Sequence, residues 1–387
     1  MIARSTVLEL GPVAVAGRKG AFALGVRDGV VASLEPVDTS PQRLALPAFA
    51  DLHVHADRAF ARGPRPPRSL ADAIELVREI KLASTADDVC ERATRLCERS
   101  LAHGALRVRT HVDVDELIGE RGLRGVLAAR EALAGRVDLE IVAFATKFAD
   151  PTTTEGVARL RWAAENGADL LGGVPAFHDD PGASIERILD LAVELGLPVD
   201  LHVDEASAPD AFVLEMLADA TVARGLEGRV TASHTCALAT VDRATSSRTI
   251  AKLAQARITV IALPALNLFL QGRGDETPRV RGLTLVRELL AGEVDVRFGS
   301  DNVRDVFYPY GDADPLEAAW LAAIAAHVND EDALLAGIAG GRSRIEPGDT
   351  ADLVLVDAVS LGDALSRRPA GRTVIRAGEV IYADAPG

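Results

Sequence analysis

Eight short apolar runs recur along the middle of the chain, and this repetition constrains the fold more than any other feature. The runs are residues 47–55, 105–112, 139–146, 169–175, 198–204, 229–234, 257–263 and 294–300. Stretches with helical periodicity separate them, for example residues 70–82, 86–103, 123–134 and 184–195. Eight strand–helix units predict an α/β fold of the (β/α)8 TIM-barrel type. A doubly wound open sheet is the alternative topology.

The two chain ends have a different pattern from the middle. Residues 1–46 and 345–387 contain short β-rich runs punctuated by glycines, without helical periodicity of comparable length. We therefore expect a small composite β-sandwich domain built from both termini. The catalytic barrel would then occupy residues 47–344.

Composition excludes several classes of partner. The formal net charge is -15, with 57 acidic against 42 basic side chains, which disfavours nucleic acids and anionic membranes. No apolar run is long enough to span a bilayer, and the N-terminus lacks the layout of a signal peptide. The three cysteines form no CxxC pair, which is typical of a reduced, cytoplasmic protein.

Histidines gather at the ends of the predicted strands. Five of the eight histidines lie in or at the end of a strand: His53, His55, His111, His202 and His234. Asp301 follows the last strand directly. Because the carboxyl ends of barrel strands form one active-site face, residues distant in sequence are expected to meet there.

Four of these residues form a predicted metal site. His53 and His55 alternate on one strand, so both imidazoles point the same way. Separately, His-x-His could be two polar residues at a strand end, Asp301 could cap a helix, and His202 could be a core histidine. Together, three imidazoles and a carboxylate predict a Zn2+ or Fe2+ site. One metal is favoured, because residues 170–178 hold no lysine or glutamate to bridge two ions.

Two further residues extend the predicted site. Glu205 comes three residues after His202, just past a strand, where it can lean over the barrel mouth. Its alternative role is a carboxylate at a helix N-terminus. His234 is either a fifth ligand or a hydrogen-bond donor. The small zinc deaminase fold is excluded, because its His-x-Glu and Pro-Cys-x-x-Cys motifs are absent.

These motifs resemble the amidohydrolase superfamily, and within it the cytosine deaminase-like branch. The resemblance covers nearly the whole chain, and its marks are residues 47–57, 108–114, 141–144, 202–205, 230–235, 270–273, 298–301 and 346–354. It implies one divalent metal held by His53, His55, His202 and Asp301. It also implies that Glu205 shuttles a proton to the ring, that His234 steadies the attacking hydroxide, and that Asp301 accepts its proton.

The reaction implied by the resemblance is hydrolytic deamination of a small amino-substituted N-heterocycle with release of ammonia. Alternatives are removal of an N-alkylamine, hydrolysis of a cyclic amide, or a non-catalytic metal-binding barrel. A binding module would have no need of Glu205. The resemblance further suggests a homo-oligomer.

The substrate-contacting positions depart from the cytosine-specific pattern. Thr146 stands where that branch has glutamine, Asn302 where it has a second aspartate, and Phe307 where it has tryptophan. Leu70 matches a position whose backbone contacts the ring in the family. These changes indicate the same chemistry on a cytosine-like or a larger ring, such as a pterin, purine or triazine. Lys147 could meet an anionic substituent or be solvated, and the role of His178 is open.

Overall fold

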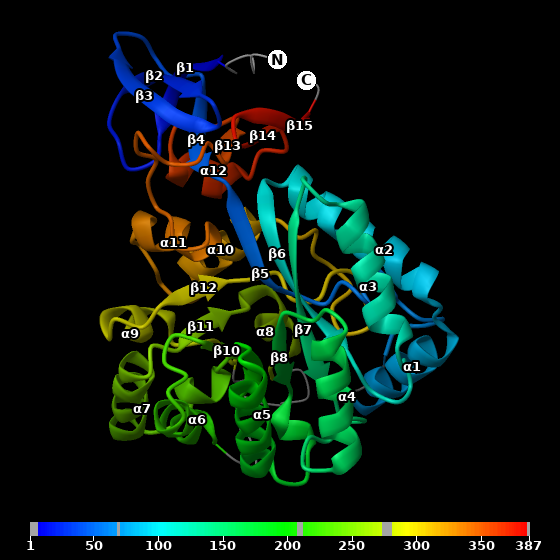
Figure 1. Cartoon of the computed structure of the whole chain (residues 1–387). Helices are drawn as coiled ribbons and strands as arrows, with labels where there is room; N and C mark the ends of the chain where they lie inside the picture. The colour runs from blue at the N-terminus through cyan, green and yellow to red at the C-terminus, as the bar shows by residue number, and fades with distance from the viewer. Residues whose placement is uncertain (1–6, 68–69, 207–211, 273–280, 385–387) are drawn as a thin grey trace.

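A computed structural model describes residues 7–67, 70–206, 212–272 and 281–384 of the chain. Figure 1 shows a barrel with its helices and, beside it, a separate sheet to which both chain ends contribute. None of the helices in these ranges is both long enough and apolar enough to cross a bilayer.

The barrel is one parallel sheet whose strands follow chain order. Its strands are β5 (Phe49–Val54), β6 (Ala105–Asp113), β7 (Asp138–Ala145), β8 (Leu170–Gly173), β9 (Val199–Val203), β10 (Val230–His234), β11 (Thr259–Ala262) and β12 (Val296–Phe298). A parallel bridge between Val54 and Asp301 links the first strand to the segment after the last. There the Asp301 amide donates to the His53 carbonyl at 2.8 Å. The predicted (β/α)8 barrel is confirmed.

Helices alternate with these strands and cover the barrel. They are α1 (Leu70–Ala83), α2 (Ala86–Ala102), α3 (Arg121–Ala132), α4 (Thr154–Glu165), α5 (Pro181–Leu195), α6 (Leu214–Ala223), α7 (Arg243–Gln255), α8 (Pro264–Leu270), α9 (Val286–Ala291), α10 (Pro315–Ala325) and α11 (Glu331–Ile338). Local chemistry sets their ends. Thr85 and Asp88 form a reciprocal capping box that starts α2. Gly196, with φ +70°, ends α5 in the left-handed conformation that glycine adopts readily.

The chain ends form one seven-stranded mixed sheet of order β15-β14-β13-β4-β1-β2-β3. Its strands are β1 (Val7–Val15), β2 (Ala21–Arg27), β3 (Val30–Val37), β4 (Arg43–Pro47), β13 (Leu353–Val356), β14 (Arg372–Arg376) and β15 (Glu379–Ala383), with α12 (Leu361–Arg367) between β13 and β14. The pairing of β4 with β13 joins the two termini. The predicted small β-domain from both termini is thus present, while its limits at 46 and 345 stay predictions.

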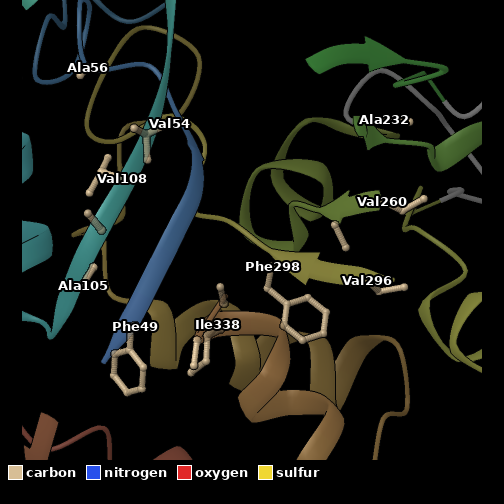
Figure 2. Packing of buried hydrophobic residues seen from close by; sticks show 14 of the residues in the cluster. Phe49, Val54, Ala56, Ala105, Val108, Ala232, Val260, Val296, Phe298 and Ile338 are labelled. Carbon is tan, nitrogen blue, oxygen red and sulfur yellow. The ribbon is translucent and has the colours of Figure 1, made fainter. Parts of the chain in front are cut away.

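Aliphatic side chains build most of the core, as expected for a chain with 4 % aromatic residues. Figure 2 shows part of it, with Val108, Val260 and Phe298 from barrel strands and Ile338 from α11. A Cβ atom on Gly337 would lie 2.3 Å from the Phe298 ring, so α11 approaches the barrel closely there. Packing at this density holds the strand ends, and therefore the site, in place.

Candidate metal and catalytic site

The four residues predicted to bind metal lie together at one end of the barrel. His53 is on β5 and His55 follows it, His202 is on β9, and Asp301 follows β12. One potential ligand atom from each lies within 4.8 Å of the others, and all four side chains are buried. Nε2 of His55 is 3.2 Å from Nε2 of His202 and 3.3 Å from Oδ1 of Asp301. Ligands of a tetrahedral zinc ion stand about 3.3 Å apart, so the donor set fits a divalent cation.

The electrostatics of this cluster also fit a cation. Nε2 of His53 and both carboxylate oxygens of Asp301 are buried, and none has a hydrogen-bond partner among the described residues. Burial and the neighbouring imidazoles lower the pKa of His53 well below its usual value, so its lone pair is free. Burial raises the pKa of Asp301 well above its usual value. A buried carboxylate of this kind is stabilised by a bound cation.

His234 is held in one orientation beside the cluster. The Asn267 amide nitrogen lies 3.0 Å from His234 Nδ1 and donates to it. Because burial lowers the pKa of His234, the ring is neutral and carries its proton on Nε2. That nitrogen faces Oδ2 of Asp301 at 3.8 Å. The geometry favours the hydrogen-bond donor over the fifth metal ligand.

Glu205 lies at the mouth, next to His234. Its side chain is 27 % exposed, and its Oε1 is 3.9 Å from His234 Nδ1. The Gln271 side chain donates to the Glu205 backbone carbonyl at 2.6 Å, which anchors this segment. Glu205 does not lie in the first turn of α6, which begins at Leu214; the neighbouring Asp204 accepts from the Leu214 amide instead. Glu205 is therefore free to face the site.

The backbone at these strand ends is strained. Asp204, His234 and Asp301 have φ angles of +49°, +71° and +61°, in the left-handed region that non-glycine residues rarely adopt. Such conformations cost about 1–3 kcal/mol each and cluster at functional sites.

The residues predicted to contact substrate belong to a second polar group at the mouth. The Thr146 hydroxyl donates to Asp115 Oδ2 at 2.6 Å and accepts from the Phe148 amide at 3.2 Å. Lys81, from α1, places its ammonium against Asp115 and 2.7 Å from Asp113 Oδ2. The hydrogen-bonding capacity of Thr146 is therefore used within the protein.

Asn302 and Phe307 connect to the same group through Arg58. Arg58 donates to Asp113 at 3.1 Å and lies 5.5 Å above the Phe307 ring. The Asn302 amide donates to Asp305, which also faces Arg58. We call Arg58, Lys81, Asp113, Asp115 and Asp305 the rim network. A cavity of about 20 Å³, the size of one water molecule, lies within it.

Three other predicted positions can be placed. Leu70 begins α1, but its side chain lies outside the described residues. Lys147 is exposed. His178 donates from Nε2 to the Thr146 carbonyl at 3.0 Å and accepts from the Ser184 hydroxyl at Nδ1. His178 therefore holds the end of β7 in position.

Sequence reasoning missed several residues that contact the site. Asn267 and Arg58 were not singled out, because they lie outside the strands and reach the site through packing of other segments. Asp200 and Ser233 were not singled out either, although Asp200 lies on β9 two residues before His202 and Ser233 lies on β10 directly before His234. His111, predicted at a strand end, lies beneath the cluster with Nε2 3.3 Å from Asp200 Oδ1. His53, His111 and Asp200 form a second group of potential ligands, but Arg109 already pairs with Asp200 at 2.9 Å. An arginine in that place leaves no need for a second cation.

The chain resembles known proteins over nearly its full length. Residues 155–382 match the sequence model of the amidohydrolase family. A pterin deaminase from Rhizobium rhizogenes is 34 % identical over 93 % of this chain and 88 % of its own length.

Two solved structures share the fold. The 5-methylcytosine deaminase from Klebsiella pneumoniae, liganded with 5-fluorocytosine, superposes with a TM-score of 0.90 at 29 % identity, covering 99 % of this chain and 98 % of the other. The N-isopropylammelide isopropylaminohydrolase from Burkholderia multivorans gives 0.84 at 30 % identity, covering 98 % of each chain.

Fold and site together define a barrel hydrolase with a histidine–aspartate cluster suited to a metal ion. The chain belongs to the amidohydrolase family.

Proposed function

We propose that this protein is a hydrolytic deaminase of an amino-substituted pteridine-type ring, acting with one Zn2+ or Fe2+ ion held by His53, His55, His202 and Asp301. Relatives named for heterocycle deamination support the proposal: they include a pterin deaminase and a 5-methylcytosine deaminase. The observation that carries the proposal is Glu205, a carboxylate beside His234 at the mouth of the buried cluster.

The donor set accounts for the metal requirement. Imidazole nitrogens and a carboxylate oxygen suit Zn2+ and Fe2+ better than Mg2+ or Ca2+, which prefer oxygen ligands. Such an ion, when bound, lowers the pKa of a coordinated water from about 15.7 towards about 7. Absence of a bridging residue in the described β8 segment supports a single ion.

The protein's own side chains move the protons. Asp301 accepts a proton from the attacking water, and the Nε2–H of His234 donates a hydrogen bond that holds the water in place. Glu205 protonates the ring nitrogen next to the amino-bearing carbon, so that negative charge does not accumulate there. The carbon–nitrogen bond then breaks as the amino group takes the proton that Asp301 accepted from water and leaves as ammonia, while the Glu205 carboxylate takes the proton of the added hydroxyl group to form the carbonyl.

The rim network supports a ring larger than cytosine. Thr146 is shorter than the glutamine of the cytosine-specific pattern, and Asp115 holds its hydroxyl away from a ligand. We therefore expect Thr146 to leave space for a larger ring, where the glutamine would contact the substrate. The relative from Rhizobium rhizogenes, named for a two-ring substrate, supports the same size class.

Ammonia release from a substrate panel tests this proposal. The metal-loaded protein would be assayed with pterin, cytosine, 5-methylcytosine, adenine and an aminotriazine. We expect the highest kcat/KM with pterin. Higher kcat/KM with a single-ring pyrimidine would contradict the size argument, and release of ammonia from no compound would contradict the deaminase assignment.

Removal of an N-alkylamine is the second candidate reaction. The Burkholderia multivorans structure, named for removal of an isopropylamine, supports it through a TM-score of 0.84. An N-isopropyl triazine added to the panel separates the two reactions. Release of isopropylamine without ammonia from any other ring would favour this candidate.

We also expect a homo-oligomer located in the cytoplasm. The likeness to the cytosine deaminase-like branch supports the first expectation, and three cysteines without disulfides support the second. Light scattering on the purified protein would measure the oligomeric state.

A further inference from the structure

We propose that Ser233 and Asp200 form a relay beneath the metal cluster that fixes the tautomer of His53 and thereby sets the affinity for the metal. Both would be positioning residues acting through His53. The inference rests on the metal site of the proposed function, but not on the identity of the substrate.

The direction of each hydrogen bond follows from the donors available. The Ser233 hydroxyl donates to Asp200 Oδ1 at 3.1 Å, and an ionised carboxylate can only accept. The single hydroxyl proton is therefore committed to Asp200. The same Ser233 oxygen lies 2.9 Å from His53 Nδ1, so it accepts from an Nδ1–H group. His53 then keeps a free lone pair on Nε2, which is the nitrogen that faces Asp301 at 3.8 Å.

Asp200 is itself held in a fixed position. Arg109 donates to its Oδ2 at 2.9 Å, and the Nε of Arg109 donates to Glu140 at 2.9 Å. Asp200 and Ser233 are fully buried. The relay thus runs from Glu140 and Arg109 up through Asp200 and Ser233 to His53.

The relay occupies a place that barrels commonly fill with apolar side chains. Layers of branched aliphatic residues are typical of a TIM-barrel interior. Burying a charged and hydroxylated group there costs free energy unless every member is satisfied. Partners of this kind behind a metal-binding histidine orient the ring and raise metal affinity. The relay places such a partner behind His53.

A matched pair of variants tests the relay. Ser233→Ala removes the acceptor for His53 Nδ1–H. Thr231→Ala is the control, because Thr231 is two residues earlier on β10, points to the same side, and contacts Arg109 at 3.4 Å without reaching His53. Zn2+ affinity would be measured on the full chain by competition with a chromophoric chelator. We expect affinity to fall about 10–100-fold in Ser233→Ala and to change by less than about twofold in Thr231→Ala.

Two further measurements keep the inference testable if Ser233→Ala does not fold. Ser233→Thr retains the hydroxyl and should bind Zn2+ within about twofold of the wild-type affinity. Nitrogen-15 NMR of histidine-labelled, Zn2+-loaded wild-type protein should show the proton of His53 on Nδ1. A proton on Nε2 would overturn the inference, as would equal affinity losses in Ser233→Ala and Thr231→Ala.

These outcomes are independent of the reaction. Weaker Zn2+ binding in Ser233→Ala, combined with no ammonia release from the substrate panel, would support the relay and contradict the proposed function. Normal Zn2+ affinity in Ser233→Ala, combined with ammonia release by the wild-type protein, would contradict the relay and support the proposed function.

Discussion

The metal cluster and the rim network lie at the same mouth of the barrel. They differ in how many of their buried polar atoms have hydrogen-bond partners within the protein. In the metal cluster, Nε2 of His53 and both oxygens of Asp301 are buried without hydrogen-bond partners among the described residues. In the rim network, Lys81 pairs with both Asp113 and Asp115, and the neighbouring Thr146 hydroxyl donates to Asp115. Among the described residues, Arg58 Nε is the one buried polar side-chain atom of this network without a hydrogen-bond partner, and it lies 3.8 Å from Asp305. The metal cluster is incomplete without a ligand, whereas the rim network is paired almost throughout within the protein.

The difference separates two kinds of function. A buried polar atom without a partner costs about 1–3 kcal/mol, and more when it is charged, so its retention indicates a missing ligand. A network whose polar atoms are nearly all paired within the protein fixes shape. We therefore assign binding of the ion to the cluster, and the shape of the substrate cavity to the rim network. Variants in the two groups should have opposite consequences for metal content and for stability.

The largest expected effect comes from Asp301→Asn. This change removes the carboxylate of the cluster and the proposed proton acceptor, so turnover should fall to background and bound metal should fall with it. Metal analysis and ammonia release would be measured together. Asp305→Asn, four residues away in the rim network, is the control and should retain the metal. Full metal content and activity in Asp301→Asn would contradict the assignment of metal binding to the cluster.

Glu205→Gln separates chemistry from metal binding. The amide keeps the shape but cannot donate and accept the proton, so kcat should fall about 10²–10⁴-fold. Metal content should equal that of the wild type, because Glu205 is not one of the four clustered ligands. Wild-type turnover in this variant would exclude the proposed proton shuttle.

Lys81→Met should act on stability and leave the metal in place. It leaves the buried Asp113 and Asp115 without their shared ammonium, which typically costs about 3–5 kcal/mol of unfolding free energy. Urea denaturation would measure the loss. Adding Asp115→Asn to this variant should restore part of it, since one unpaired charge is removed. Loss of metal from Lys81→Met at unchanged stability would reverse the assignment of the two groups.

The smallest effect is expected from an ion pair on the surface, outside both groups. Hydrogen bonds from Arg248 and Lys252 lower the pKa of Glu215 from 4.5 to about 2. A depressed carboxylate pKa stabilises the folded state above the unfolded pKa, and this contribution is lost as the pH falls through the folded value. Because the group is solvent-screened, Glu215→Gln should cost at most about 1 kcal/mol at pH 7.

Thermal unfolding at several pH values would check that prediction. The difference between Glu215→Gln and wild type should shrink between pH 4.5 and about 2. It should also shrink in high salt, because exposed charges are screened. A stability difference that grows as the pH falls would contradict the lowered pKa of Glu215.

Periodicity made the barrel predictable, and with it the residues that meet at its mouth. The strand ends carrying His53, His202 and Asp301 could be placed together because carboxyl ends of parallel strands share one face. Asn267 and Arg58 could not be found in this way. Asn267 lies in a helix that follows a strand, and Arg58 matters only because Asp113 and Asp305 fold against it. Such partnerships depend on side-chain packing, which a single sequence does not reveal.

Adding metal back to stripped protein tests the central claim most directly. Protein treated with a strong chelator would be titrated with Zn2+ or Fe2+ while ammonia release from pterin is followed. Activity should rise linearly and stop at one equivalent per chain, with no gain in Asp301→Asn. Full activity in the thoroughly stripped protein, or a plateau at two equivalents, would contradict a single ion held by His53, His55, His202 and Asp301.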